Sequence, residues 1–107
     1  MHILSEREKA LEGQYFLDSE RSFRLCVRRD RLFAMWVAGL VGRDDCAVYA
    51  DEITDARLRG DGDNQIVSKA LSDLRAAGNN ISEPEVMAKM RELMAEAVQQ
   101  LTAEGER

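Results

Sequence analysis

Hydrophobic residues recur at helical spacing from the start of the chain to about residue 101. In residues 5–41 they fall every three or four positions, and no proline interrupts the chain before Pro84. Ser5 and Glu8 match a capping box, which places a helix start there. The pattern predicts one long helix from about Ser5 to Val41. Its apolar positions are Leu11, Tyr15, Phe16, Phe23, Cys26, Val27, Phe33, Trp36, Val37 and Leu40.

The two ends of this predicted helix differ in their density of apolar groups. From Phe23 onward the apolar stripe is wide enough to face a core. Before Phe23, charged residues occupy every turn, and Gly13 costs about 1 kcal/mol of helix propensity. We therefore predict an arm, residues 1–17, that is mobile in the free chain, and a bundle over residues 18–107.

Glycines and capping residues divide the middle of the chain into two shorter helices. Gly42 is placed to end the long helix, and an aspartate at 44 or 45 to cap the next one. The glycines at 60 and 62 end that second helix. Asp63 is predicted to cap a third helix, and Gly78 to end it. The third helix has one clear apolar stripe: Ile66, Val67, Ala70, Leu71 and Leu74.

A fourth helix starts at a second capping box, formed by Ser82 and Glu85 with Pro84 in the first turn. We expect Trp36 and the methionines of this helix, Met87, Met90 and Met94, to belong to the core. The chain has 107 residues, 45% hydrophobic and 33% charged, with one proline and only 6% aromatic residues. Together these features predict a single all-α domain, an antiparallel four-helix bundle with a long first helix.

The charge balance and the N-terminus limit the classes of partner. A net charge of -5, with the acidic excess in residues 44–63 and 79–107, argues against a protein that grips nucleic acid. No run of about 20 apolar residues occurs, and the charged N-terminus does not look like a signal peptide. We expect a cytoplasmic protein without membrane insertion, in which Cys26 and Cys46 are free thiols.

The sequence carries no recognisable catalytic, metal or phosphate-loop motif. Its one histidine, His2, has no nucleophile and carboxylate at local spacing. The loop at 60–65 resembles a calcium loop, but Ile66 stands where that loop needs glycine and Ser72 where it needs a carboxylate. We predict that the protein is not an enzyme and has neither a metal site nor a cofactor.

An arginine face on the long helix allows two interpretations. Arg21, Arg24 and Arg28 share one side of the helix, where guanidinium groups could hold a phosphate of ADP or ATP, or carboxylates of a partner. The simpler interpretation is a solvated surface of salt bridges, which the residues favour. The local partners would then be Asp18, Glu20 and Asp30. On the residues alone, the chain is a helical adaptor or regulator.

Several segments, in order, resemble one family. They are Leu4–Glu12; Asp18, Glu20 and Phe23; Arg28–Leu32; Trp36–Ala38; Tyr49–Ala50; Gly62; Lys69; and Asp73–Ser82. With these segments the chain resembles, over nearly its whole length, the zeta subunit family of the alpha-proteobacterial F-type ATP synthase. It departs from that family at Gly13, where larger or helix-favouring residues are usual, at Asp30, where Asn is usual, and at Arg57, where a carboxylate is common.

The resemblance implies a bundle with an inhibitory N-terminal segment. That segment would become helical in the catalytic head of the synthase and block rotation in the hydrolytic direction, with no chemistry by this chain. The contact surface that we expect consists of Leu4, Arg7, Glu8, Leu11, Glu12 and Tyr15. The alternative is a weakly or non-inhibitory paralogue that serves as a nucleotide-binding or helical scaffold module.

Overall fold

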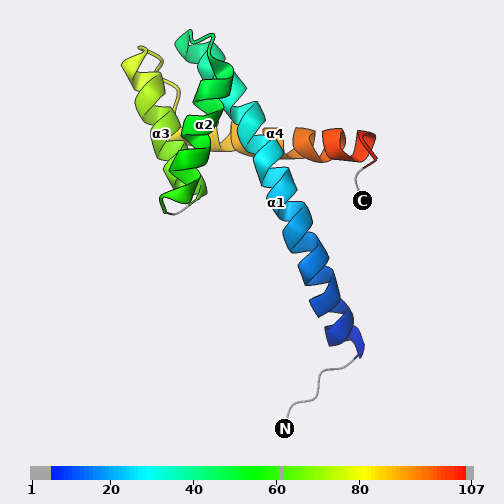
Figure 1. Ribbon diagram of the computed structural model, residues 1–107. Helices are drawn as coiled ribbons and strands as arrows, with labels where there is room; N and C mark the ends of the chain where they lie inside the picture. Colours follow the sequence, from blue (N-terminus) through cyan, green and yellow to red (C-terminus); the bar gives the residue numbers. More distant parts are fainter. Residues whose placement is uncertain (1–5, 61, 106–107) are drawn as a thin grey trace.

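Four helices account for nearly all of the chain. The computed structural model describes the backbone of residues 6–60 and 62–105, and the side chains of those ranges from Glu20 onward. The helices are α1 (Glu6–Val41), α2 (Cys46–Leu58), α3 (Asp63–Ala76) and α4 (Glu83–Ala103), and the described residues include no strand (Figure 1). The prediction of an all-α four-helix bundle with a long first helix is confirmed.

The helices are not all aligned in the way that a simple antiparallel bundle predicts. Figure 1 shows α1, α2 and α3 running up, down and up beside one another, while α4 runs across them. The most extensive helix–helix packing is between α1 and α4. The N-terminal half of α1 extends beyond the other three helices (Figure 1).

The core lies where the C-terminal half of α1 meets the other three helices. Its largest fully buried side chains are Tyr49, Phe33, Ile53, Ile66, Leu74, Val37 and Val86. Trp36 packs against this core, its ring 5.8 Å from that of Phe33, and Met90 is buried. The core assignment is therefore confirmed for these two residues, but it is wrong for Met87, which is exposed.

Glycines end α1 and α3 as the sequence predicts. Gly42 and Gly78 have φ values of +79° and +82°, a backbone conformation that side-chain-bearing residues rarely adopt. After each glycine, the next backbone N–H donates to a carbonyl five residues earlier: Arg43 to Ala38 and Asn79 to Leu74, both at 2.8 Å. This is the Schellman arrangement, which satisfies carbonyls that the helix end leaves open.

The predicted caps at the helix starts are confirmed at Ser82, confirmed in position only at Asp45, and wrong at Asp63. Ser82 caps α4, and Glu85 completes the capping box. Asp45 stands at the N-cap of α2 but makes no capping hydrogen bond, because its carboxylate accepts from Arg43 at 2.8 and 2.7 Å. Asp63 is the first residue of α3, after Gly62 as N-cap. Its carboxylate accepts from arginines instead, since charged donors form stronger hydrogen bonds than backbone amides.

The core-facing part of α1 starts later than its apolar stripe predicts. Phe23 is 69% exposed and Val27 44%. The first buried side chains of the described part of α1 are Arg29 and Asp30, and the first buried apolar one is Phe33. Arg29 meets the start of α3 and Asp30 meets the end of α2, so the earlier turns of α1 extend beyond the level at which these helices could cover them.

Candidate functional site

The predicted contact surface belongs to the N-terminal half of α1. The helix runs without interruption from Glu6 to Val41, through Gly13 and through the predicted arm boundary at residue 17. Leu4 and the side chains of the other five contact residues, Arg7, Glu8, Leu11, Glu12 and Tyr15, lie outside the described residues. Ser5 of the first capping box does so too. Both the contact surface and the division into arm and bundle therefore stay predictions.

One member of the arginine face is held by α4. Arg28 donates to both carboxylate oxygens of Glu104, at 2.6 and 2.8 Å, and to Gln100 at 3.1 Å. The hydrogen bonds with Glu104 raise the pKa of Arg28 and lower that of the Glu104 carboxyl. This two-point pair ties the middle of α1 to the end of α4. A phosphate at Arg28 would have to compete with a carboxylate already in place.

The other two arginines of that face, Arg21 and Arg24, agree only in part with the predicted surface of salt bridges. Arg24 lies 4.0 Å from Glu20 one turn earlier, as a surface salt bridge would. Arg21 is half-buried. Asp30 is not a local partner of this face, because its buried carboxylate pairs with Arg29 and Arg57. The salt-bridge interpretation gains support at Arg24, and phosphate binding stays a prediction.

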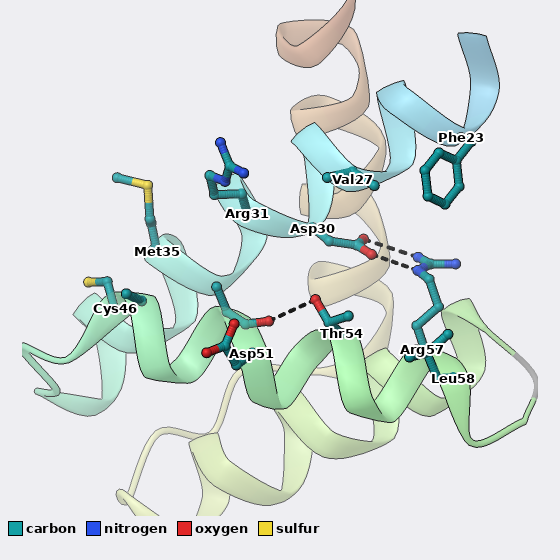
Figure 2. Close-up of a pocket in the computed structure, with 12 residues that line it drawn as sticks. Phe23, Val27, Asp30, Arg31, Met35, Cys46, Asp51, Thr54, Arg57 and Leu58 are labelled. Carbon is teal, nitrogen blue, oxygen red and sulfur yellow. Dashed lines mark hydrogen bonds and ion pairs between the residues drawn. The ribbon is translucent and has the colours of Figure 1, made fainter. Parts of the chain in front are cut away.

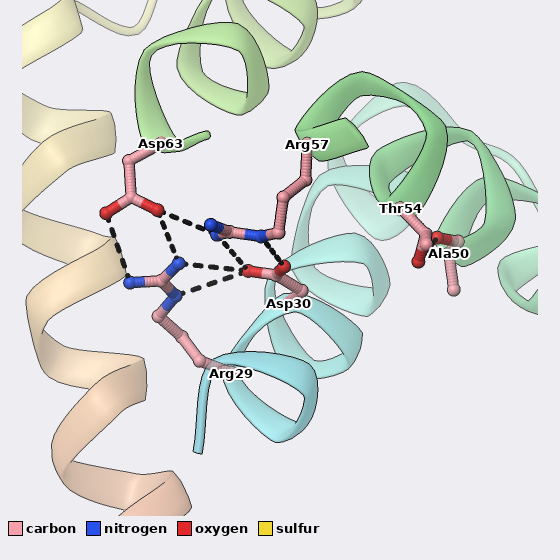
Figure 3. Close-up of polar contacts among 6 residues, drawn as sticks. All are labelled: Arg29, Asp30, Ala50, Thr54, Arg57 and Asp63. Atoms are coloured by element: carbon pink, nitrogen blue, oxygen red, sulfur yellow. Dashed lines mark hydrogen bonds and ion pairs between the residues drawn. The ribbon is translucent and has the colours of Figure 1, made fainter. Parts of the chain in front are cut away.

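A partly buried network of four charged residues joins α1, α2 and α3 (Figure 3). Arg29 and Asp30 are only 5% and 6% exposed. Asp30 accepts from Arg57 at 2.6 and 3.0 Å and from Arg29 at 3.1 Å. Asp63 accepts from Arg29 and from Arg57, each at 2.7 Å. Two guanidinium groups and two carboxylates thus neutralise one another where α1 meets the turn between α2 and α3.

The mutual pairing outweighs the effect of burial on these groups. Burial lowers the pKa of Arg29, but its carboxylate partners raise it by more. Burial likewise raises the pKa of Asp63, and the hydrogen bonds from Arg29 and Arg57 bring it below the ordinary value. This network was not predicted from the sequence. The only signal was that Asp30 and Arg57 carry opposite charges, and they lie 27 residues apart.

A second polar cluster surrounds the fully buried ring of Tyr49. The Tyr49 hydroxyl donates to Asp73 at 2.7 Å, and the Lys69 ammonium bridges Asp73 and Glu52 at 3.0 and 2.9 Å. Arg43 also donates to Glu52, at 2.9 Å, from just past the end of α1. Hydrogen bonds from Arg43 and Lys69 lower the pKa of Glu52 to about 2. These contacts fasten α1, α2 and α3 together at the opposite end from the Asp30 network.

A groove between α1 and α2 remains open on the surface (Figure 2). It has a volume of about 670 Å³, and its lining includes Phe23, Val27 and Met35 from α1 and Leu58 from α2. The Asp30–Arg57 ion pair spans from one helix to the other inside it (Figure 2). We call this feature the α1/α2 groove. The apolar pattern of the sequence predicted that Phe23 and Val27 face the core, so this groove was not expected.

The described residues offer no ready metal site. They contain no cluster of three or more histidine, cysteine or acidic side chains that could hold an ion. His2 lies outside the described residues, as does Asp61 of the loop that resembles a calcium loop. Cys26 and Cys46 are free, as predicted, and half-buried. No helix in the described part of the chain is long and apolar enough to cross a membrane.

These features define a small helical bundle with one helix projecting from it. In the comparisons with known proteins, the profile of the family described as ATPase inhibitor subunit zeta matches residues 1–100. The chain therefore belongs to the ATPase inhibitor subunit zeta family, which is the family that its sequence segments resemble. A search of curated proteins found no match.

Proposed function

We propose that the protein inhibits ATP hydrolysis by the catalytic head of an F-type ATP synthase, and that it acts sterically through the N-terminal half of α1. The observation that carries the proposal is the course of α1 in a chain of this family. One uninterrupted helix starts outside the bundle and ends in its core. In this role the protein is a regulator and needs neither a metal nor a cofactor.

A firm anchor for the C-terminal half of α1 supports the proposal. The C-terminal half of α1 is held by the buried Phe33 and Val37 and by the Asp30 network. When bound to the head, a helical arm would present Leu4, Leu11 and Tyr15 to a groove, with charged residues of the same segment, Arg7, Glu8 and Glu12, at the rim. If the arm orders only on binding, part of the contact energy offsets roughly 1 to 2 kcal/mol of backbone entropy per ordered residue.

Truncation tests the proposal most directly. A chain lacking residues 1–14 should stay folded, because the first buried side chain among the described residues is Arg29. It should lose its inhibition of ATP hydrolysis by the purified cognate head. The Leu11→Asp variant should lose inhibition too, since it places a charge in an apolar contact. Thermal unfolding of both proteins serves as the control for folding. Equal inhibition by the truncated and full-length chains would rule out the arm mechanism.

A gain-of-function variant tests whether the arm binds as a helix across Gly13. Replacing Gly13 with Ala favours the helix by up to about 1 kcal/mol. The Gly13→Ala variant should therefore inhibit at up to about fivefold lower concentration. Unchanged or weaker inhibition would indicate that the bound arm is not helical at that position.

Nucleotide binding is the second candidate function, and one observation favours it. A shallow pocket of about 330 Å³ between α1 and α4 places the exposed Phe23 ring beside Arg28 and Arg31. An aromatic ring next to guanidinium groups suits a base and its phosphates. Addition of ATP should then shift the backbone resonances of Arg21, Arg24 and Arg28 saturably, and Arg24→Glu should abolish the shift. Absence of any saturable shift would remove this candidate.

A further inference from the structure

The α1/α2 groove is walled by two regular rows of side chains (Figure 2). The α1 row consists of every fourth residue: Phe23, Val27, Arg31 and Met35. The α2 row has three- and four-residue spacing: Ala47, Asp51, Thr54 and Leu58. Rows with these spacings are the ridges that helices present to one another when they pack. The groove therefore offers two ridges of side chains against which a third helix can pack.

The lining of the groove combines exposed apolar groups with two charged side chains that pair with no other described residue. Phe23 is 69% and Leu58 78% exposed, and Met35 is more than half exposed. A groove lined mainly by exposed apolar side chains is a candidate interaction surface in a soluble protein. Arg31 on one wall and Asp51 on the other make no ion pair or hydrogen bond through their side chains within the described part of the chain. An occupant with matching charges would find both of them available.

The inner surface of the groove allows a helix to approach closely. Ala47 and Ala50 on α2 have small side chains. Arg57 Nε donates to Asp30 Oδ2 at 2.6 Å, and this ion pair holds α2 against α1. Because both of these charges are already satisfied, the ion pair needs nothing from the occupant. A rigid groove lowers the ordering cost of binding, which favours an occupant that is itself a preformed helix.

The course of α1 indicates which molecule supplies that helix. Tyr15 of the proposed contact surface precedes Phe23 by eight residues of the same helix, which is about 12 Å at 1.5 Å per residue. A surface that holds the arm up to Tyr15 therefore lies about two helical turns from the groove. The two sites would be used together by one partner.

We propose that the α1/α2 groove receives a surface helix of the same catalytic head that binds the arm. This helix carries an apolar stripe against Phe23, Met35 and Leu58, an acidic residue facing Arg31 and a basic residue facing Asp51. The inference rests on the function proposed above and adds a second contact to it. The groove contributes affinity, while the arm blocks the catalytic head.

The test measures the affinity of the full-length chain for the purified cognate head. In one variant Phe23 and Leu58 are both replaced by Gln. The matched control replaces Val48 and Met87 by Gln, because these are also exposed apolar residues on helices and neither lines the groove. The groove variant should bind at least tenfold more weakly and still inhibit fully at saturation. The control should bind within twofold of the unmodified chain.

The charges in the groove provide a second variant. Asp51→Lys should weaken binding several-fold, because the basic residue of the partner then meets a like charge. Light scattering measures the oligomeric state of each protein at the concentration used for the binding measurements. Thermal unfolding checks that every variant is folded.

Each result decides between the inference and the function on which it rests. Equal affinities of the groove and control variants would overturn the groove contact and leave the arm mechanism intact, provided that Leu11→Asp still abolishes inhibition. If the unmodified chain neither binds nor inhibits the head, both proposals are wrong. A dimer that only the groove variant dissociates would show that the occupant is a second copy of this chain, which would also overturn the inference.

Discussion

The two stretches of α1 on either side of Arg29 carry apolar side chains at the same helical spacing, yet their surroundings are opposite. Phe23 is 69% and Val27 44% exposed, whereas Phe33 and Val37 are fully buried. The difference arises from the neighbours, because α2 and α3 meet at the level of Arg29 and cover α1 only beyond it. An apolar stripe shows that a helix has a face to cover, but it does not show whether the same chain covers that face.

The largest expected effect separates the two phenylalanines of α1. Phe33→Ala should lower the free energy of unfolding by about 3 to 5 kcal/mol, because it leaves a cavity in the core. Phe23→Ala should change it by less than about 0.5 kcal/mol, because its ring is largely exposed in both states. Urea denaturation of the two variants measures both values. A comparable loss from Phe23→Ala would break the comparison.

The next effect tests the junction at which the two stretches meet. Asp30→Asn should cost about 2 to 4 kcal/mol, because it leaves the buried guanidinium of Arg29 and that of Arg57 short of a negative charge. Combining it with Arg57→Gln should cost less than the sum of the single changes, since the two residues are direct partners. Denaturation of the double-mutant cycle gives the coupling. Strict additivity would argue against the pair as an energetic unit.

Acid sensitivity sharpens the comparison at the covered end of α1. Glu52 binds Arg43 there, and its pKa falls from 4.5 to about 2 in the folded chain. A lowered folded-state pKa contributes stability that is fully present above about pH 4.5 and is lost as the pH falls towards 2. The free energy of unfolding should therefore decline over this range, and less steeply in Glu52→Gln. Identical slopes for the variant and the unmodified chain would contradict this role of Glu52.

The smallest expected effect on stability comes from the Arg28–Glu104 pair, which holds the less covered stretch of α1. Glu104→Gln removes the charge that Arg28 binds at the end of α4, but both groups are accessible to water. The melting temperature should hardly change, and any loss should shrink further at high salt. Salt-dependent thermal unfolding measures it. A drop as large as that of Asp30→Asn would mean that α4 anchors α1 through this pair.

The sequence by itself determined the features that depend on residues close to one another. The end of α1 at Gly42, the end of α3 at Gly78 and the capping box of α4 were predicted correctly, because the hydrogen bonds that form them join residues within about five positions. The five apolar positions of α3 are all buried, as its clear stripe indicated. The family was also readable, since ordered short segments carry it.

Only the tertiary structure decided which side chains meet across helices. Asp63 was expected to cap α3, and it binds arginines of α1 and α2 instead. Asp30 and Arg57 are 27 residues apart in sequence, and no local rule pairs them. The exposure of Phe23 and the groove beside it depend on where α2 and α3 end against α1. Local hydrogen bonds are set by spacing along the chain, whereas burial and distant ion pairs are set by how the helices are placed, and a periodic pattern does not contain that placement.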